Sequence, residues 1–140
     1  MRFLFLDFDG VLHPAVPGAF NVAEHFCWLP ILQKLLIAHP DVFLVVHSTW
    51  RYDHRDHELR VLLGELGERF AGSAPSGPRD QAVISVLEAN KHLEIKYLVL
   101  DDDGHAFLDS GLNVLNLAPE LGLSAPEAQA ALRAWLQETA

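Results

Sequence analysis

The sequence predicts an α/β protein with a three-layer, doubly wound parallel sheet, in which helices cover both faces of the sheet. Two observations favour this class. Short apolar runs of strand length alternate with segments of helical periodicity along the 140 residues. The runs are apolar at consecutive positions, which is typical of strands buried on both faces. Half of the residues are hydrophobic, enough for one core, so we expect a single domain over residues 1–140.

The first half of the chain is expected to contain two strands and two helices. Residues 2–7 form an apolar run of strand length, and residues 41–48 form a second one rich in Val. Helical spacing of apolar side chains is found in HFCWLPILQKLLIAH (25–39) and in RDHELRVLLGEL (55–66). The segment GSAPSGP (72–78) is rich in turn-forming residues, so we expect a loop there.

The second half continues the alternation. RDQAVISVLEANKHL (79–93) has helical periodicity, whereas KYLVLDD (96–102) and LNVLNL (112–117) are short apolar runs that predict strands. A last helix closes the chain. Ser124 and Glu127 precede its apolar pattern at the spacing of a capping box, so we expect Ser124 to cap this helix.

Composition and charge exclude several classes of function. Acidic residues outnumber Lys and Arg by 19 to 10, which argues against a broad surface for nucleic acid or for an anionic membrane. The single cysteine, Cys27, cannot form an internal disulfide, so we expect a cytoplasmic protein in which Cys27 is a buried apolar residue. The opening run MRFLFL is interrupted by Asp7, too early for a signal peptide or a membrane span.

Polar side chains follow the predicted strands at their carboxyl ends, where open parallel sheets bind their ligands. Asp7 ends the first strand, and Asp9 lies two residues later, so an extended backbone places both carboxylates on one side. Gly10 then permits a sharp turn and a close approach by a ligand. The second strand ends at the hydroxyls of Ser48 and Thr49, either of which suits a polar pocket.

Acids also follow the strand at 96–102, in the run Asp101, Asp102 and Asp103. Carboxylates gathered in one place repel one another unless a cation compensates them, and oxygen ligands favour Mg²⁺. A phosphoryl group in such a site also needs a protein cation, and Arg79 and Lys91 compete for this role. We favour Arg79, because the helix would begin near the catalytic edge and carry Lys91 about 18 Å away.

These residues together resemble the haloacid dehalogenase (HAD) superfamily of phosphohydrolases. The pattern is DFDGVL from Asp7, then Ser48 after an apolar strand, a basic helix start at Arg79, and the pair Asp101-Asp102 after another strand. The resemblance covers residues 3 to about 109, and its first motif is the most specific part. The segment HSTWR (47–51) also resembles the HAD domain of Swiss Army Knife RNA repair proteins, where a Ser/Thr-x-Trp stretch follows the second strand.

The resemblance implies a role for each matching residue. Asp7 would be the nucleophile that forms an aspartyl-phosphate, and Asp9 the general acid and base. Mg²⁺ would be bound by the Asp7 carboxylate, the Asp9 backbone carbonyl and Asp102, with Asp101 acting through water or as a partner of the ligands. Ser48 would hydrogen-bond the phosphoryl group, and Arg79 would neutralise its charge. Many relatives carry lysine at the position of Arg79.

The short connection between the first two predicted strands leaves no space for a substantial cap domain. An open site of this kind suits a phosphate on a large substrate, such as an RNA or DNA terminus or a protein. The loop HPAVPGAFN (13–21) is expected to form a flap over the site.

Two other classes of function are weighed against a phosphohydrolase. A two-component receiver domain would carry its acidic pair on the first strand and a lone acceptor aspartate later, which is the reverse of the order in this chain. A catalytically idle HAD-like binding module would more often lack Asp7 or Asp9, and both are present.

Two further features of the sequence are given structural interpretations. His54 and His57 are one helical turn apart, but no cysteine or third histidine lies nearby, so a solvated helix start is favoured over a zinc site. Trp50 is expected to pack at the edge of the core, with stacking on a base or a sugar as the alternative.

Overall fold

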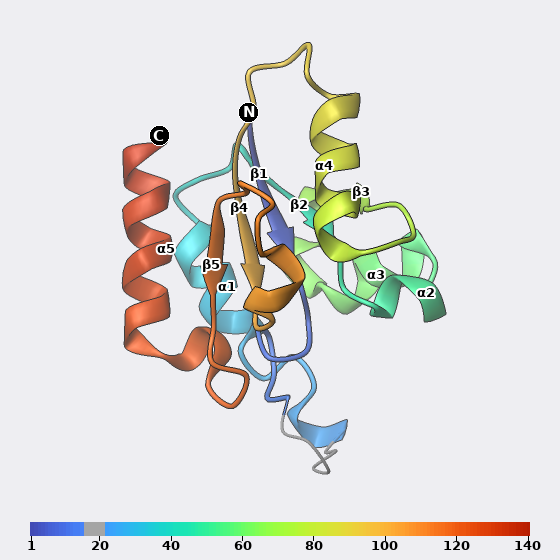
Figure 1. Ribbon diagram of the computed structural model, residues 1–140. Coiled ribbons are helices and arrows are strands. Elements are labelled where there is room, and N and C mark those ends of the chain that lie inside the picture. The colour runs from blue at the N-terminus through green and yellow to red at the C-terminus, as the bar shows by residue number, and fades with distance from the viewer. Residues whose placement is uncertain (16–21) are drawn as a thin grey trace.

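The computed structural model describes residues 1–15 and 22–140. Its centre is a five-stranded sheet in the order β3-β2-β1-β4-β5, in which every pair of neighbours is parallel. Figure 1 shows the sheet between its helices. The strands are β1 (Arg2–Leu6), β2 (Val42–Val46), β3 (Phe70–Ser73), β4 (Lys96–Asp101) and β5 (Val114–Asn116). The predicted α/β class with a parallel sheet is therefore confirmed.

α-Helices and short 3₁₀ helices alternate with the strands. The α-helices are α1 (Leu29–Leu36), α2 (Trp50–Asp53), α3 (Asp56–Leu62), α4 (Arg79–Ala89) and α5 (Pro126–Glu138). The 3₁₀ helices are η1 (Val22–Glu24), η2 (Gly64–Arg69), η3 (Gly104–Phe107) and η4 (Gly122–Ser124). Among the described residues of the β1–β2 connection only η1 and α1 are regular, so this part of the chain contains no cap domain.

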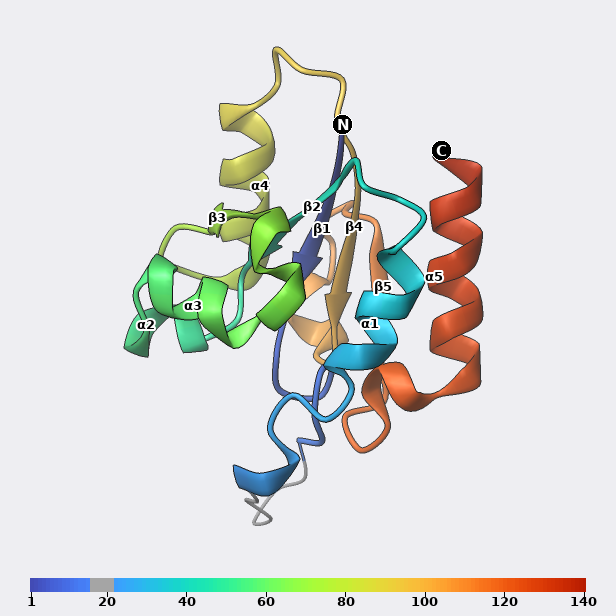
Figure 2. The ribbon, with the colours of Figure 1, turned by 180° about the vertical axis from the view of Figure 1, so that it is seen from behind.

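The two faces of the sheet follow from the alternation of side chains along β1. Leu4 and Leu6 belong to the larger core cluster, which α1, α3 and α5 cover, whereas Phe3 and Phe5 belong to a smaller one covered by α4 and η3. The two opposite views agree, because α4 lies in front of the sheet in Figure 1 and α1 lies in front of it in Figure 2. Each of these central residues is at most 6% exposed, so β1 is buried on both faces as the sequence predicts.

Three expectations about individual elements were wrong. β3 lies at an edge and overlaps the segment predicted as a loop. The helix predicted over 25–39 is shorter, since only Leu29–Leu36 is α-helical. Ser124 does not cap α5, because the helix begins at Pro126 after Ala125, and the Ser124 hydroxyl donates to the Leu121 carbonyl instead.

Two remaining expectations concern the surface. Cys27 is exposed, which corrects the prediction that it is a buried apolar residue. The predicted flap over residues 13–21 lies for the most part outside the described residues. In the described part of the chain, no helix has the length and apolar character needed to cross a membrane.

The order of the strands determines where a site can form. The chain runs outward from β1 through β2 to β3, and then returns to the other side of β1 for β4 and β5. The helices that follow β1 and β4 therefore lie on opposite faces, and open parallel sheets bind their ligands at such a point, beyond the carboxyl ends of the two strands. Asp7 follows β1 and Asp101 ends β4, so both acids lie at this point of the sheet.

Candidate active site

Asp7, Asp101 and Asp102 form the acidic centre of this edge. Each offers an oxygen, and the three oxygens lie within 4.8 Å of one another. Asp7 is only 1% exposed. Its Oδ1 accepts a hydrogen bond from the backbone N–H of Phe8 at 2.9 Å, and its buried Oδ2 has no hydrogen-bond partner. Burial raises the pKa of Asp7 well above its usual range, and neighbouring Asp101 raises it further.

Gly10 and Asp102 share the space beside this cluster. Gly10 has a φ of 77°, in the region that favours glycine, and a Cβ at this position would overlap Asp102 Oδ2. The sequence predicts that Gly10 leaves room for a ligand, but in the structure the Asp102 side chain occupies that room. Burial raises the pKa of the Asp102 carboxyl. Gly10 therefore permits the third acid to approach the other two.

Arg79, the first residue of α4, supplies the positive charge. Its Nη1 lies 2.8 Å from Asp101 Oδ1 and 3.6 Å from Asp7 Oδ2. Burial lowers the pKa of the guanidinium, but the charges of Asp7 and Asp101 outweigh this effect and raise it overall. Lys91 follows the other end of α4, is 79% exposed and lies 4.0 Å from Glu88. The structure thus brings Arg79, not Lys91, to the acidic cluster.

Asp101 is held by donors at both of its oxygens. Oδ1 accepts from Arg79 and, at 2.8 Å, from the backbone N–H of Asp103, while Oδ2 lies 2.7 Å from His47 Nε2. Burial alone would raise the pKa of Asp101, but the hydrogen bond from His47 and the charge of Arg79 bring it below its usual value. Asp101 is therefore ionised, buried and fixed in orientation.

His47 is a residue of this site that the sequence analysis missed. It ends the apolar run of β2, is fully buried, and has no hydrogen-bond partner at Nδ1. Burial lowers its pKa, against the opposing effect of Asp101, so the neutral ring donates through Nε2–H to Asp101. The signal was a polar residue directly after a buried strand and directly before Ser48.

Ser48 and Thr49 differ in their environment. Ser48 is fully buried, and its Oγ accepts a hydrogen bond from the backbone N–H of Trp50 at 3.2 Å. Thr49 is exposed and precedes α2 without a side-chain cap. The Ser48 hydroxyl therefore remains free to donate a hydrogen bond to another acceptor, whereas Thr49 faces solvent.

Asp9 lies at the border between the cluster and solvent, with a side chain that is 48% exposed. Its Oδ1 lies 2.7 Å from His13 Nε2, and the indole N–H of Trp50 lies 3.2 Å from each carboxylate oxygen. The hydrogen bond from His13 is the main cause that lowers the pKa of Asp9, with a contribution from Trp50 against the effect of burial. His13 was not identified from the sequence.

Trp50 packs at the edge of the core, as expected, and its rings contact both Phe8 and His54. The His54 ring stacks on the indole at 5.3 Å between centroids, and its Nδ1 lies 3.0 Å from the Trp50 carbonyl oxygen.

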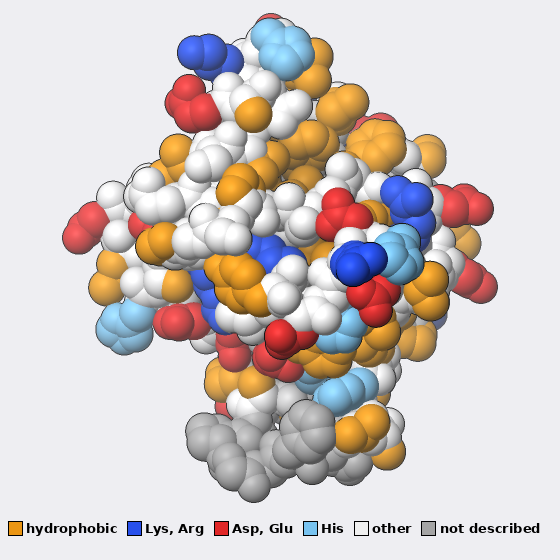
Figure 3. Space-filling view, turned by 90° about the vertical axis from the view of Figure 1, so that its right-hand side faces the viewer, with side chains coloured by type: hydrophobic (Ala, Val, Ile, Leu, Met, Phe, Trp, Pro, Cys, Tyr) orange, Lys and Arg blue, Asp and Glu red, His pale blue; other side chains and the backbone are white. Residues whose placement is uncertain are grey.

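Among the described residues, the group with the geometry of a metal site is the three aspartates, and it includes neither His54 nor His57. Figure 3 shows acidic and histidine side chains side by side in the lower half of that view.

Arg51 is a further residue that the sequence analysis did not assign. Its guanidinium donates to the carbonyl oxygens of His47 and Ser48 after β2, and of Ala74 and Pro75 after β3. These bonds join two loops at the catalytic edge, and the second loop leads directly into α4 and Arg79. Burial lowers the pKa of Arg51.

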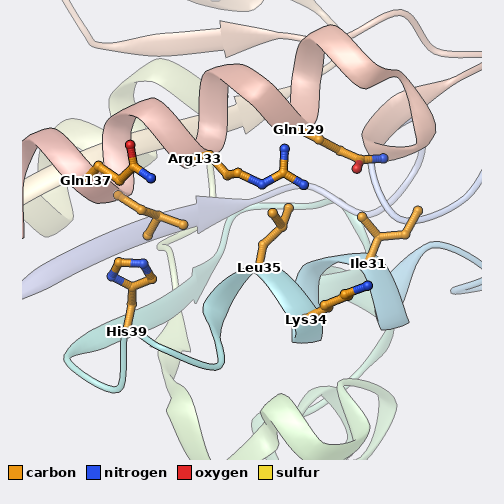
Figure 4. Close-up of a pocket in the computed structure, with 8 residues that line it drawn as sticks. Ile31, Lys34, Leu35, His39, Gln129, Arg133 and Gln137 are labelled. Carbon is orange, nitrogen blue, oxygen red and sulfur yellow. The ribbon is translucent and has the colours of Figure 1, made fainter.

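A separate hollow lies between α1 and α5. It has a volume of about 400 Å³, and Figure 4 shows its lining side chains on the two helices and, for His39, on the loop that follows α1. None of the residues of the acidic cluster lines it; its lining comprises Ile31, Lys34, Leu35, His39, Gln129, Arg133, Leu136 and Gln137. The chemistry of the acidic edge is therefore independent of this hollow.

The comparisons with known proteins identify the family of this chain. Residues 3–128 match the family described as the HAD domain in Swiss Army Knife RNA repair proteins, and this range includes every candidate residue named above. No curated protein sequence matches the chain significantly. The matched range covers most of the chain and includes residues of all five strands, so the chain belongs to the family of HAD domains found in Swiss Army Knife RNA repair proteins.

Proposed function

We propose that this protein is a Mg²⁺-dependent phosphohydrolase that acts through an aspartyl-phosphate on Asp7. The observation that carries the proposal is the state of Asp7. Its buried Oδ2 has no hydrogen-bond partner, yet it lies 3.6 Å from Arg79 and close to two other carboxylates. A buried oxygen without a donor is unfavourable unless a cation or a substrate atom binds it.

The residues of the cluster fit a magnesium ion. All three side chains offer oxygen, the ligand that Mg²⁺ prefers, and their spacing of at most 4.8 Å allows them to share one cation. We assign Asp7, Asp102 and the backbone carbonyl of Asp9 as ligands. Asp101 already accepts from His47, Arg79 and Asp103, so it acts through water or as a partner of the ligands. When bound, the ion supplies charge neutralisation to the carboxylates and to the phosphoryl oxygens.

The reaction has two steps in this assignment. Asp7 Oδ2 attacks phosphorus in line, the bond from phosphorus to the leaving oxygen breaks, and Asp9 gives that oxygen a proton. Asp9 then takes a proton from water, whose oxygen attacks the phosphorus of the aspartyl-phosphate and releases phosphate and free Asp7. Arg79 and the Ser48 hydroxyl bind phosphoryl oxygens in both steps.

The environment of Asp9 supports its use in both directions. Its hydrogen bonds to His13 and Trp50 lower its pKa, so the free carboxylate is ready to act as the base of the second step. In the first step, the negative charge of an arriving phosphate favours the protonated carboxyl, which is the form that donates. Its half-exposed position lets it reach a leaving group that lies outside the pocket.

The open edge indicates an accessible phosphate on a large substrate, such as a nucleic-acid end. Two observations support this part of the proposal: no cap domain covers the site within the described residues, and the family is named for RNA repair proteins. The excess of acidic residues suits contact at a terminus rather than along a strand. A chain without an internal disulfide suits the cytoplasm.

The test compares the native protein with Asp7→Asn on p-nitrophenyl phosphate, with and without Mg²⁺. We expect turnover that requires Mg²⁺ and falls at least about 1,000-fold in the variant, because the amide is not a nucleophile. Asp53→Asn, an exposed aspartate of α2, is the matched control and should keep native turnover. Oligonucleotides with a 5′- or 3′-phosphate, phosphopeptides and small phosphate esters then identify the substrate.

The alternative is a catalytically idle binding module of the same fold. It predicts that Mg²⁺ raises the melting temperature of the native protein but not of Asp7→Asn, while no substrate of the panel is hydrolysed. That combination would contradict the proposed catalysis and leave the metal site in place.

A further inference from the structure

His13 has a buried ring whose two nitrogens are both engaged. The ring is 2% exposed. The backbone N–H of Phe26 donates to Nδ1 at 3.2 Å, so Nδ1 is an acceptor and the proton of the neutral ring is on Nε2. Nε2 lies 2.7 Å from Asp9 Oδ1. The tautomer of His13 is therefore set by the Phe26 amide, and its N–H is directed at the carboxylate.

The backbone around His13 is built to keep this direction. The N–H of Gly10 donates to the His13 carbonyl at 2.8 Å, which closes a tight turn and brings residue 13 alongside Asp9. Phe26 has a φ of 60°, an unfavourable conformation for a bulky residue. Its ring packs edge-on against His13, at 5.3 Å between centroids. Strain of this kind persists where the surroundings require one geometry.

A second donor reaches Asp9 from a different element. Trp50, in α2, directs its indole N–H at both carboxylate oxygens, at 3.2 Å from each. Asp9 therefore receives hydrogen bonds from two sides, while about half of its side chain remains open to solvent. An exposed carboxylate is satisfied by water and needs no protein donors, so the two donors fix its orientation rather than compensate its burial.

We propose that His13 is a positioning residue, which holds the Asp9 carboxylate in the orientation from which it exchanges a proton with the leaving oxygen. The proposal rests on the proposed function and adds a residue to it. The Nε2–H of His13 supplies the hydrogen bond, the Phe26 amide fixes the tautomer, and Trp50 supplies the second donor. His13 itself does not touch the substrate.

The test measures the first step alone, as single-turnover release of the alcohol or phenol with enzyme in excess. His13→Leu removes the donor, His13→Gln retains an N–H donor on a shorter planar group, and His92→Leu repeats the loss of a histidine at an exposed site. Each is compared on an alkyl phosphate, whose alkoxide must be protonated, and on p-nitrophenyl phosphate, whose phenolate leaves without a proton.

We expect His13→Leu to lower the rate of the first step on the alkyl phosphate by roughly 10- to 100-fold. A general acid accelerates such a step by about 100- to 10,000-fold, and a misplaced one loses part of this acceleration. The rate on the aryl phosphate should fall by less than about 5-fold, and the affinity for either substrate should change by less than about 2-fold. His13→Gln should recover most of the loss, and His92→Leu should match the native protein. Equal slowing of both substrates, or a loss confined to affinity, would overturn the proposal.

A measurement without substrate keeps the inference separate from the proposed function. In nitrogen-15 NMR of the native protein, Nδ1 of His13 should have the shift of an unprotonated acceptor. Asp9→Ala should move the Nε2–H resonance of His13 and leave that of His92 in place. An unchanged Nε2–H resonance would contradict the contact, whereas the absence of turnover in the native protein would contradict the proposed function alone.

Discussion

At Gly10, the carboxylate of Asp102 occupies the space in which any other residue would carry its side chain. The backbone there also has a φ of 77°, which costs an L-residue about 1 kcal/mol or more. These two effects are separable, because Gly111 has a similar φ of 73° and open space around its Cβ position. A side chain at either position would suffer backbone strain, but only a side chain at position 10 would also clash with Asp102.

Gly10→Ala and Gly111→Ala should therefore have different effects on activity. Gly111→Ala should lower the free energy of unfolding by about 1 kcal/mol, measured by urea denaturation, and Gly10→Ala should lower it by more, because the clash with Asp102 adds to the backbone strain. Gly10→Ala should in addition displace Asp102 and reduce Mg²⁺-dependent turnover by about 100-fold or more, since Asp102 is a proposed ligand. Equal turnover in the two variants would show that Asp102 does not need its present position.

The residue scale also shows what the sequence could and could not reveal about the site. The aspartates and Arg79 were predicted because each follows a strand or begins a helix, and such ends converge in a parallel sheet. His47 and His13 were missed. The partner of His47 is Asp101, far away in sequence, and the direction of the His13 N–H toward Asp9 depends on the Phe26 amide, which follows in a separate turn. The sequence pattern around a histidine in an apolar run does not reveal which residue is its hydrogen-bond partner.

At the scale of elements, the edge strand β3 depends on its neighbour rather than on its own sequence. Residues Phe70–Ser73 contain Ala and Gly, which have low strand propensity, and their pairing with β2 shifts register between Leu44 and Val45. The sequence thus predicts the central strands, which are uniformly apolar, and misses an edge strand whose stability comes from pairing. The helix predicted over 25–39 begins only at Leu29, because Phe26 has a φ of 60° and so cannot belong to a right-handed helix.

Arg51 fixes the loop that follows β3. Its Nε and Nη2 donate at 3.1 Å to the carbonyl oxygens of Ala74 and Pro75, and its Nη1 donates to those of His47 and Ser48. A lysine keeps the charge but cannot reach carbonyls in several directions at once. The start of α4, and with it Arg79, should then lose its fixed position relative to Asp7.

We therefore expect Arg51→Lys to lower turnover by about 10-fold and to speed amide hydrogen exchange in residues 74–78. The melting temperature should fall by only a few degrees. Arg133→Lys, at an exposed position of α5, is the matched control and should leave both exchange and turnover unchanged. Faster exchange without any loss of turnover would show that the order of this loop does not control the position of Arg79.

At the scale of the whole molecule, an ion pair closes the end of the sheet opposite the active site. Arg2, at the start of β1, donates to both oxygens of Asp41 at 2.8 and 2.7 Å, and to the carbonyl oxygen of Leu136 in α5 at 2.8 Å. Arg2 is buried, whereas the Asp41 side chain is about half exposed. The hydrogen bonds from Arg2 lower the pKa of Asp41 to about 2.

The pH dependence of this pair has a definite sign. Because the pKa of Asp41 is lower in the folded chain than its usual value of 3.8, the contribution to stability is complete above about pH 5 and disappears as the pH falls toward 2. Asp41→Asn lacks the contribution at every pH. Solvent screening limits it to about 1 kcal/mol, so the melting temperatures should differ by about 3 °C at pH 6.

This difference should close between pH 4 and pH 2, and it should shrink in 0.5 M salt, in thermal denaturation followed by circular dichroism. Asp53→Asn should melt with the native protein throughout, because Asp53 is exposed on α2 and no arginine is paired with it among the described residues. A difference in melting temperature of the same size at pH 2 would mean that Asp41 stabilises the fold through its shape and not its charge. The loss of stability in acid would then come from other ionisable groups.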